Sequence, residues 1–194
     1  MKTSSRSFSY LAINAITLYR LVSVIFLVYL VLTEQLNLFR WLLAVSFFTD
    51  AIDGFLARKF KVVSVLGSRI DSIADDLTVL VAFVGLYFFK EDFVKNYYEF
   101  IVLLVVIFLI QLTAALIRYN KFTSFHTILA KCAMILQGCF LILIFFLPEP
   151  PMWLFYGAVA VTALELVEEI ILIFMLPKWQ TDIKGIYWVL KKNR

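Results

Sequence analysis

The chain has 194 residues, of which 63% are hydrophobic and only 16% are charged. Soluble domains are usually close to half apolar and a quarter charged, so this composition excludes an ordinary soluble domain and indicates an integral membrane protein. The formal net charge of +4 is modest, and we expect no nucleic-acid partner. At about 25 to 30 residues per span with its loop, the length allows about six helices in a single membrane domain, residues 1–194.

Polar or proline-containing breaks divide the hydrophobic part of the chain into six expected spans. These cover residues 14–33, 38–58, 67–89, 99–118, 126–147 and 152–176. The segment from Lys90 to Asn96 is expected to be a hydrophilic loop. A short basic segment at 1–9 and a tail from Lys178, which mixes Trp, Tyr and Lys, are expected at the membrane interface. The predicted fold is therefore all-α: a polytopic membrane protein with six transmembrane helices, an N-terminal interfacial segment and a C-terminal interfacial tail.

Positively charged residues are divided unevenly between the two sides of this arrangement. Fifteen of the 18 Lys and Arg residues fall on the side of both termini, and three, Arg40, Lys90 and Lys95, fall on the other. Because Lys and Arg concentrate in cytoplasmic loops, we expect both termini and the facing ends of the second and third spans on the cytoplasmic side. The expected location is a plasma membrane of the bacterial inner-membrane type.

Two pairs of aspartates lie inside the second and third expected spans. Asp50 and Asp53 are three residues apart, and Asp71 and Asp75 are four apart, so each pair shares one face of a helix. Carboxylates inside membrane spans are costly and usually mark function or pairing. These carboxylates suit hard divalent cations such as Mg²⁺ or Mn²⁺. A structural cluster of salt bridges with neighbouring arginines is the alternative.

The spacing from Asp50 to Asp75, Asp-x2-Asp-Gly-x2-Ala-Arg-x8-Gly-x3-Asp-x3-Asp, resembles the signature of the CDP-alcohol phosphatidyltransferases, membrane enzymes that build phospholipids. All eight signature positions are filled, and every gap has the right length. The resemblance implies a CDP-diacylglycerol donor, a small polar alcohol as acceptor, release of CMP, and a homodimer among membrane lipids. It also implies two divalent ions, Mg²⁺ or Mn²⁺, held by Asp50, Asp53, Asp71 and Asp75. Asp75 is the expected general base and catalytic residue.

Four further signature positions are expected, on the resemblance, to contact the CDP moiety. They are Gly54, Ala57, Arg58 and Gly67. A missing or small side chain lets a base or a diphosphate approach the helix backbone, and the guanidinium fork binds diphosphate oxygens. The alternatives are close helix–helix packing for the small residues and a marker of the membrane edge for Arg58.

The start of the first span carries a second, weaker pattern. Asn14, Thr17 and Arg20 resemble an Asn-x-x-Thr-x-x-Arg often found in the first helix of the family. At a spacing of three they share a helix face, so Asn14 and Thr17 are expected to line the CDP pocket. Helix capping and a cytoplasmic anchor explain them equally well.

A second basic group lies where the fourth and fifth spans meet. Arg118, Lys121 and Lys131, with His126 between them, are candidates for binding the phosphate of an acceptor. Ordinary anchoring at the cytoplasmic surface is the alternative. A phosphorylated acceptor fits this group best, so glycerol 3-phosphate is the expected acceptor. A phosphatidylserine-synthase or phosphatidylinositol(-phosphate)-synthase type of acceptor is the alternative.

Three glutamates, Glu165, Glu168 and Glu169, lie inside the sixth expected span. We expect structural pairing, for example with Arg118 or Lys131, and keep acceptor recognition as the alternative.

Two hypotheses from other classes are a divalent-cation transporter and a scaffold without catalysis. A permeation path needs polar residues through both halves of the membrane, whereas the intramembrane charges here gather in one half. The intact signature argues against a scaffold.

Overall fold

The structure is a computed structural model of the chain, and it describes residues 19, 21–60, 65–120, 125, 127–178, 180 and 183–192. Within these ranges, the side chains of residues 50, 51, 53–60, 65–73, 75, 76 and 192 fall outside the description. The described part is helical and contains no strand, which confirms the all-α class. Residues 1–94 and 95–194 form two compact units.

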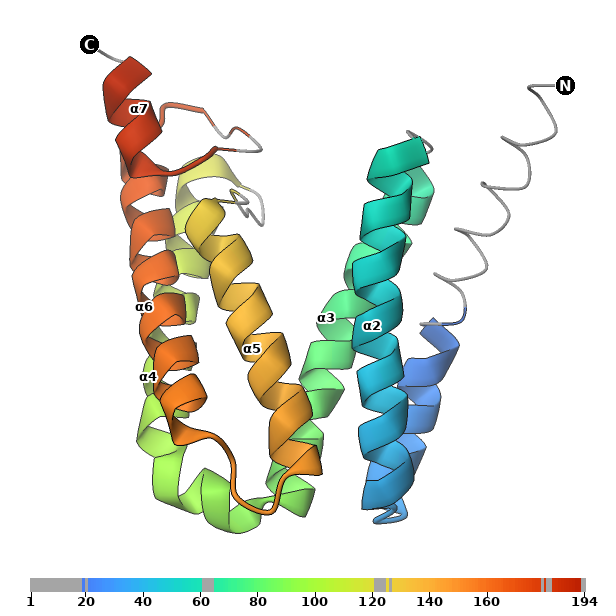
Figure 1. Ribbon diagram of the computed structural model, residues 1–194. Helices are drawn as coiled ribbons and strands as arrows, with labels where there is room; N and C mark the ends of the chain where they lie inside the picture. The colour runs from blue at the N-terminus through green and yellow to red at the C-terminus, as the bar shows by residue number, and fades with distance from the viewer. Residues whose placement is uncertain are drawn as a thin grey trace, which may run out of the picture. The chain divides into compact units, whose positions relative to one another are not determined.

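The first unit contains an apolar helix, Leu21–Leu32, followed by α2 (Leu36–Phe60) and α3 (Val65–Phe89). The hydroxyl groups of Ser23 and Ser46, both buried, lie 3.2 Å apart and join the first helix to α2. The rings of Phe39, near the start of α2, and Phe89, at the end of α3, lie 5.2 Å apart. The start of α2 therefore packs against the end of α3, so the two helices run antiparallel (Figure 1).

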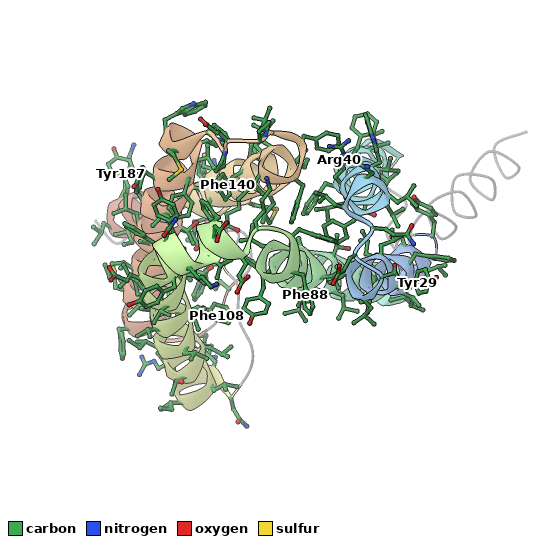
Figure 2. All side chains as sticks on the ribbon, turned by 90° about the horizontal axis from the view of Figure 1, so that it is seen from below. Tyr29, Arg40, Phe88, Phe108, Phe140 and Tyr187 are labelled. Carbon is green, nitrogen blue, oxygen red and sulfur yellow. The ribbon has the colours of Figure 1, made fainter. Side chains whose placement is uncertain are left out.

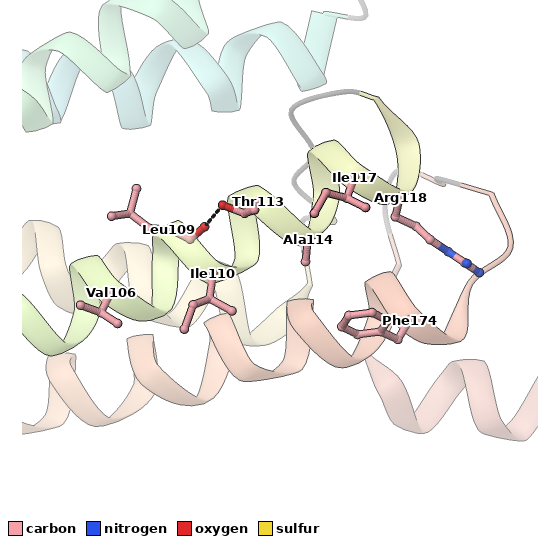
Figure 3. A pocket seen from close by; sticks show the side chains of 8 residues that line it. All are labelled: Val106, Leu109, Ile110, Thr113, Ala114, Ile117, Arg118 and Phe174. Atoms are coloured by element: carbon pink, nitrogen blue, oxygen red, sulfur yellow. Dashed lines mark hydrogen bonds between the residues drawn. The ribbon is translucent and has the colours of Figure 1, made fainter.

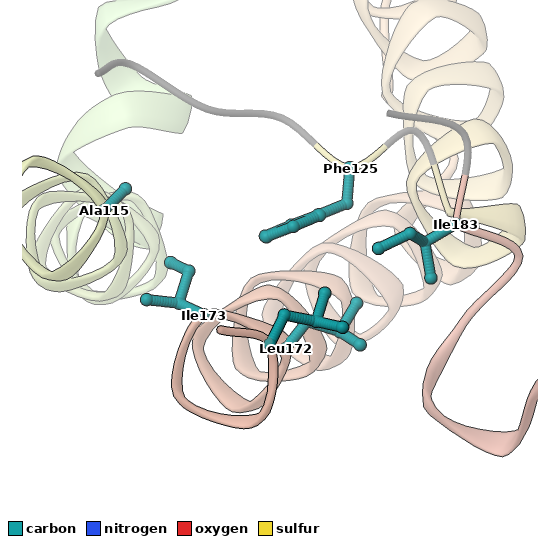
Figure 4. Packing of buried hydrophobic residues seen from close by; sticks show 6 residues of the cluster. Ala115, Phe125, Leu172, Ile173 and Ile183 are labelled. Atoms are coloured by element: carbon teal, nitrogen blue, oxygen red, sulfur yellow. The ribbon is translucent and has the colours of Figure 1, made fainter. Parts of the chain in front are cut away.

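The second unit is built from α4 (Glu91–Tyr119), which begins just before it, α5 (Ile128–Phe146), α6 (Met152–Met175) and the short α7 (Ile186–Lys192). At one end, the rings of Tyr97, Phe100, Phe140 and Phe155 form an aromatic cluster between α4, α5 and α6. At the other end, a core of six buried residues joins α4 and α6 to the connecting segments (Figure 4). Its members are Ala115, Phe125, Leu172, Ile173, Leu176 and Ile183.

Among the described residues, the helix boundaries agree with the predicted spans to within about two residues except at the start of α4, while the predicted start of the first span at residue 14 lies outside the described residues. The segment from Lys90 to Asn96, predicted to be a loop, is helical from Glu91 onward, and Tyr97 (φ −127°, ψ 16°) marks a kink. Glu91 and Asp92 lie in the first turn, where negative charge stabilises the positive end of the helix dipole. The loop prediction was wrong because polarity alone does not separate a solvated helical turn from a loop.

Large apolar side chains cover much of the exposed surface of the described helices. Phe88, Phe108 and Tyr187 project outward with 51%, 49% and 66% of their surfaces exposed (Figure 2). Soluble monomers rarely show so much exposed apolar surface, whereas lipid covers such side chains at little cost. Two described helices, α4 and α5, are long and apolar enough to cross a membrane. Six transmembrane helices and a single domain stay predictions.

Gly85 on α3 provides a test of the packing between α2 and α3. A Cβ at this position would lie 2.5 Å from Cζ of Phe39, whose side chain is fully buried, whereas a Cβ at Gly138 on α5 meets nothing within 4 Å. We expect Gly85→Ala to lower the free energy of unfolding by about 1–3 kcal/mol, through overpacking. Gly138→Ala should raise it by up to about 1 kcal/mol, because Ala is the better helix former. Thermal unfolding of both variants in detergent checks this, and a Gly85→Ala protein as stable as Gly138→Ala would contradict it.

Candidate active site

The signature lies on the two antiparallel helices of the first unit. Asp50 and Asp53 belong to α2, and Asp71 and Asp75 belong to α3. The helical backbone on both sides of the connection at 61–64 is as predicted, so each aspartate pair occupies positions on one side of its helix. The roles assigned to these side chains stay predictions, because the side chains of the four aspartates lie outside the described residues.

The signature spacing places the two pairs at matching depths. Asp50 lies ten residues before the end of α2 at Phe60, and Asp75 lies ten residues after the start of α3 at Val65. At about 1.5 Å per residue, both positions are about 15 Å from the ends that the connection joins. Asp53 and Asp71 lie seven and six residues from the same ends. The two aspartate pairs therefore lie at similar distances from the facing ends of the two antiparallel helices.

The roles of the residues expected to contact CDP also stay predictions. Gly54, Ala57 and Arg58 fall on α2 beyond Asp53, and Gly67 falls in the first turn of α3, with their side chains outside the description. Asn14 and Thr17, with Arg20, lie outside the described residues altogether.

The basic group is described in part. Arg118 lies in the last turn of α4 and Lys131 in the first turn of α5, and both are exposed. Lys121 and His126 lie outside the described residues. Thr127 caps α5 by accepting a hydrogen bond from the N–H of Ala130 at 3.1 Å, which fixes the start of the helix that carries Lys131.

Glu169 lies at the centre of a buried polar joint between α4, α6 and the segment before α5. The residue as a whole is 4% exposed. It accepts a hydrogen bond from Nε2 of Gln111 at 2.7 Å and another from the backbone N–H of Phe125 at 3.0 Å. The structural role expected for Glu169 is confirmed, with an amide and a backbone N–H as the partners that the structure shows. Buried carboxylates need such donors, because desolvation without them is expensive.

Glu168, one position earlier on α6, is hydrogen-bonded to the C-terminal segment. Its Oε1 accepts the N–H of Ile186 at 3.1 Å. Gly185 has φ +143°, a backbone conformation that favours glycine, and a Cβ there would also lie 2.8 Å from Oε1 of Glu168. The sequence carries no signal for the contact with Glu168, although a glycine directly before a helix indicates an unusual backbone conformation.

Backbone hydrogen bonds complete the attachment of the C-terminal segment. The N–H of Ile183 donates to the carbonyl of Phe125 at 3.1 Å, and the N–H of Ile128 donates to the carbonyl of Lys184 at 3.2 Å. The hydroxyl of Tyr119 lies 3.0 Å from the carbonyls of Ile173 and Leu176 at the end of α6. The segment 183–192 is therefore bonded to α6 and to the residues before and at the start of α5, while Tyr187, Trp188 and Leu190 remain exposed.

Among the described residues, no group of three or more His, Cys, Asp or Glu side chains is arranged to hold a metal ion.

Gln137, which follows Lys131 on α5, donates from Nε2 to Oγ1 of Thr162 at 2.6 Å and so links α5 to α6.

These features define a helical protein with membrane-type helices and a paired acidic motif on an antiparallel helix pair. A family model described as CDP-alcohol phosphatidyltransferase matches residues 10–164, and the chain belongs to this family. It is accordingly an enzyme, a transferase of substituted phosphate groups, in a family that transfers phospholipid head groups from CDP-alcohols and uses divalent metals. No curated protein and no solved structure matches the chain significantly. The matched range ends before Glu165, so Glu168, Glu169 and the C-terminal segment lie beyond it.

Proposed function

We propose that the protein transfers a phosphatidyl group from CDP-diacylglycerol to a polar alcohol and releases CMP. The observation that carries this proposal is the complete signature on α2 and α3, with its two aspartate pairs at matching depths in an antiparallel helix pair. Asp50, Asp53, Asp71 and Asp75 supply only oxygen ligands, which is the donor set that two Mg²⁺ or Mn²⁺ ions prefer. Bound there, the ions would neutralise negative charge on the diphosphate and on the leaving phosphate.

In this proposal Asp75 accepts the proton of the acceptor hydroxyl as its oxygen bonds to the phosphorus nearer the diacylglycerol. The bond from that phosphorus to the bridging oxygen breaks, and CMP leaves with the electron pair. Arg58 binds diphosphate oxygens with its planar guanidinium. Gly54, Ala57 and Gly67 leave room for CDP beside the backbone, and Asn14 and Thr17 are further candidates for contacts with it.

We further propose glycerol 3-phosphate as the acceptor. Arg118, Lys121 and Lys131 are the candidates that would bind its phosphate, because Arg and Lys both bind phosphate oxygens through charge-assisted hydrogen bonds. Serine, inositol and inositol phosphate are the alternatives. The uneven distribution of Lys and Arg supports a site on the cytoplasmic side of a bacterial-type plasma membrane. A homodimer is part of the proposal by family likeness.

An acceptor screen tests this function. Purified protein in detergent with Mg²⁺ receives labelled CDP-diacylglycerol and, separately, glycerol 3-phosphate, serine, inositol or inositol phosphate, and the lipid products are separated by chromatography. We expect phosphatidylglycerophosphate with glycerol 3-phosphate only, and Lys131→Gln should raise the KM for this acceptor about tenfold, the loss of one charge-assisted hydrogen bond. A lipid product with serine or inositol alone would contradict the proposed acceptor. The absence of a lipid product with all four alcohols would contradict the proposed reaction.

A further inference from the structure

The second unit has a groove that is lined mainly by apolar side chains. It runs between α4 and α6 as an open hollow of about 800 Å³. Figure 3 shows Val106 and Ile110 directed from α4 toward α6, with Phe174 on α6 and Arg118 farther along α4. The residues that line it are Val106, Leu109, Ile110, Thr113, Ala114, Ile117, Arg118 and Phe174.

The wall of this groove is apolar along its length. Ile110 and Phe174 are 53% and 67% exposed, and Ile117 is 82% exposed. The hydroxyl of Thr113 donates to the carbonyl of Leu109 at 2.7 Å, so its hydrogen-bond donor is already used within α4. A ligand that lies along this wall therefore needs to offer hydrocarbon rather than polar groups.

The charge of the groove lies at one end. Arg118, in the last turn of α4, is the one charged residue among those that line it. A guanidinium binds phosphate oxygens in a planar, bidentate geometry, and a hydrocarbon wall with a guanidinium at its end complements an amphiphile with an anionic head group.

The length of the groove matches one leaflet of a bilayer. Val106 and Arg118 are twelve residues apart on α4, which is about 18 Å of helix. The hydrocarbon of one leaflet is about 15 Å thick, half of the bilayer core. An acyl chain that lies along the groove would therefore place its phosphate at the level of Arg118.

We infer that the groove between α4 and α6 binds a phospholipid of the surrounding bilayer that carries a net negative charge, with an acyl chain against Val106, Ile110 and Phe174 and the phosphate at Arg118. This lipid is a bound component of the membrane and is separate from the donor and the acceptor. Arg118 is also one of the three candidates proposed for the acceptor phosphate, so a lipid phosphate at Arg118 would leave Lys121 and Lys131 to bind the acceptor.

The test measures lipid retained by the full-length protein. Wild-type protein is delipidated in detergent, incubated with dioleoylphosphatidylglycerol or dioleoylphosphatidylcholine, and analysed by native mass spectrometry. We expect one phosphatidylglycerol per chain, and about tenfold weaker binding of phosphatidylcholine. Arg118→Gln should weaken phosphatidylglycerol binding about tenfold, the loss of one charge-assisted contact. Lys131→Gln removes the same charge from α5, outside the groove, and should bind as the wild type does.

A second pair of variants blocks the groove without changing charge. Ile110→Trp fills it, whereas Ile135→Trp places the same side chain at an exposed position on α5, 64% exposed, outside the lining. We expect Ile110→Trp to lose the lipid and Ile135→Trp to keep it. Equal retention by all four variants, or equal binding of both lipids, would overturn the inference. A lipid-free dimer that Ile110→Trp converts to monomer would also overturn it, because the groove would then be an interface between copies. If Ile110→Trp does not fold, the comparison of Arg118→Gln with Lys131→Gln decides.

Discussion

Replacing Asp75 by Asn should lower the rate of CMP release at saturating substrates by at least about 100-fold. The loss follows because a general base contributes about 10²–10⁴-fold to a rate, and Asp75 is also one of the four proposed metal ligands. Asn keeps the size of the side chain and still offers one oxygen, but it has no negative charge and cannot accept the proton. Initial rates with CDP-diacylglycerol and the acceptor found in the screen provide the measurement.

Asp76 offers a matched control for this substitution. It is the next residue on α3 and lies about 100° around the helix from Asp75, away from the side shared by Asp71 and Asp75. Asp76→Asn should therefore keep activity within about twofold of wild type, since an exposed or paired carboxylate away from the reaction adds little to the rate. Equal losses in the two variants, with both proteins equally stable to heat, would contradict the role of Asp75.

Replacing Glu169 by Leu should destabilise the protein by about 2–5 kcal/mol. The substitution leaves the amide of Gln111 and the backbone N–H of Phe125 without the acceptor that they have now, in a place where Glu169 is 4% exposed. Each buried donor left without a partner costs about 1–3 kcal/mol. Thermal or denaturant unfolding in detergent measures the effect, and a Leu variant as stable as wild type would show that the joint adds nothing to stability.

Two further variants separate this joint from general damage to α6. Glu168→Gln should cost less than about 1 kcal/mol, because its amide oxygen can still accept the N–H of Ile186. The double variant Gln111→Leu, Glu169→Leu should cost less than the sum of the two single changes, because one interaction joins the two side chains. Strict additivity would contradict the bond between them.

Sequence predicted the helices and the class of reaction because both leave local signals. Long apolar runs predict α4 and α5, and the signature spacing predicts two aspartate pairs at similar distances from the facing ends of α2 and α3. The signature also indicates the chemistry, because carboxylates at these spacings suit divalent cations. These features depend on spacing within a few tens of residues, which a single sequence contains.

The contacts within the second unit could not be predicted from local sequence patterns. Glu169 bonds to groups 58 and 44 residues away along the chain, an amide and a backbone N–H. Hydropathy and charge patterns favour a basic partner for a buried carboxylate, and a backbone N–H has no sequence signal at all. The groove could not be predicted from the sequence either, because it depends on which sides of α4 and α6 face each other.

The most direct test of the central claim is a single metal-removal experiment on purified protein. CMP release from CDP-diacylglycerol is followed with the accepted alcohol and Mg²⁺, then after EDTA, and again after excess Mg²⁺ is restored. The four-aspartate site predicts acceptor-dependent release that falls to background with EDTA and returns with Mg²⁺, in wild type but not in Asp71→Asn. Acceptor-dependent release that continues undiminished in EDTA, or that Asp71→Asn supports at the wild-type rate, would contradict it.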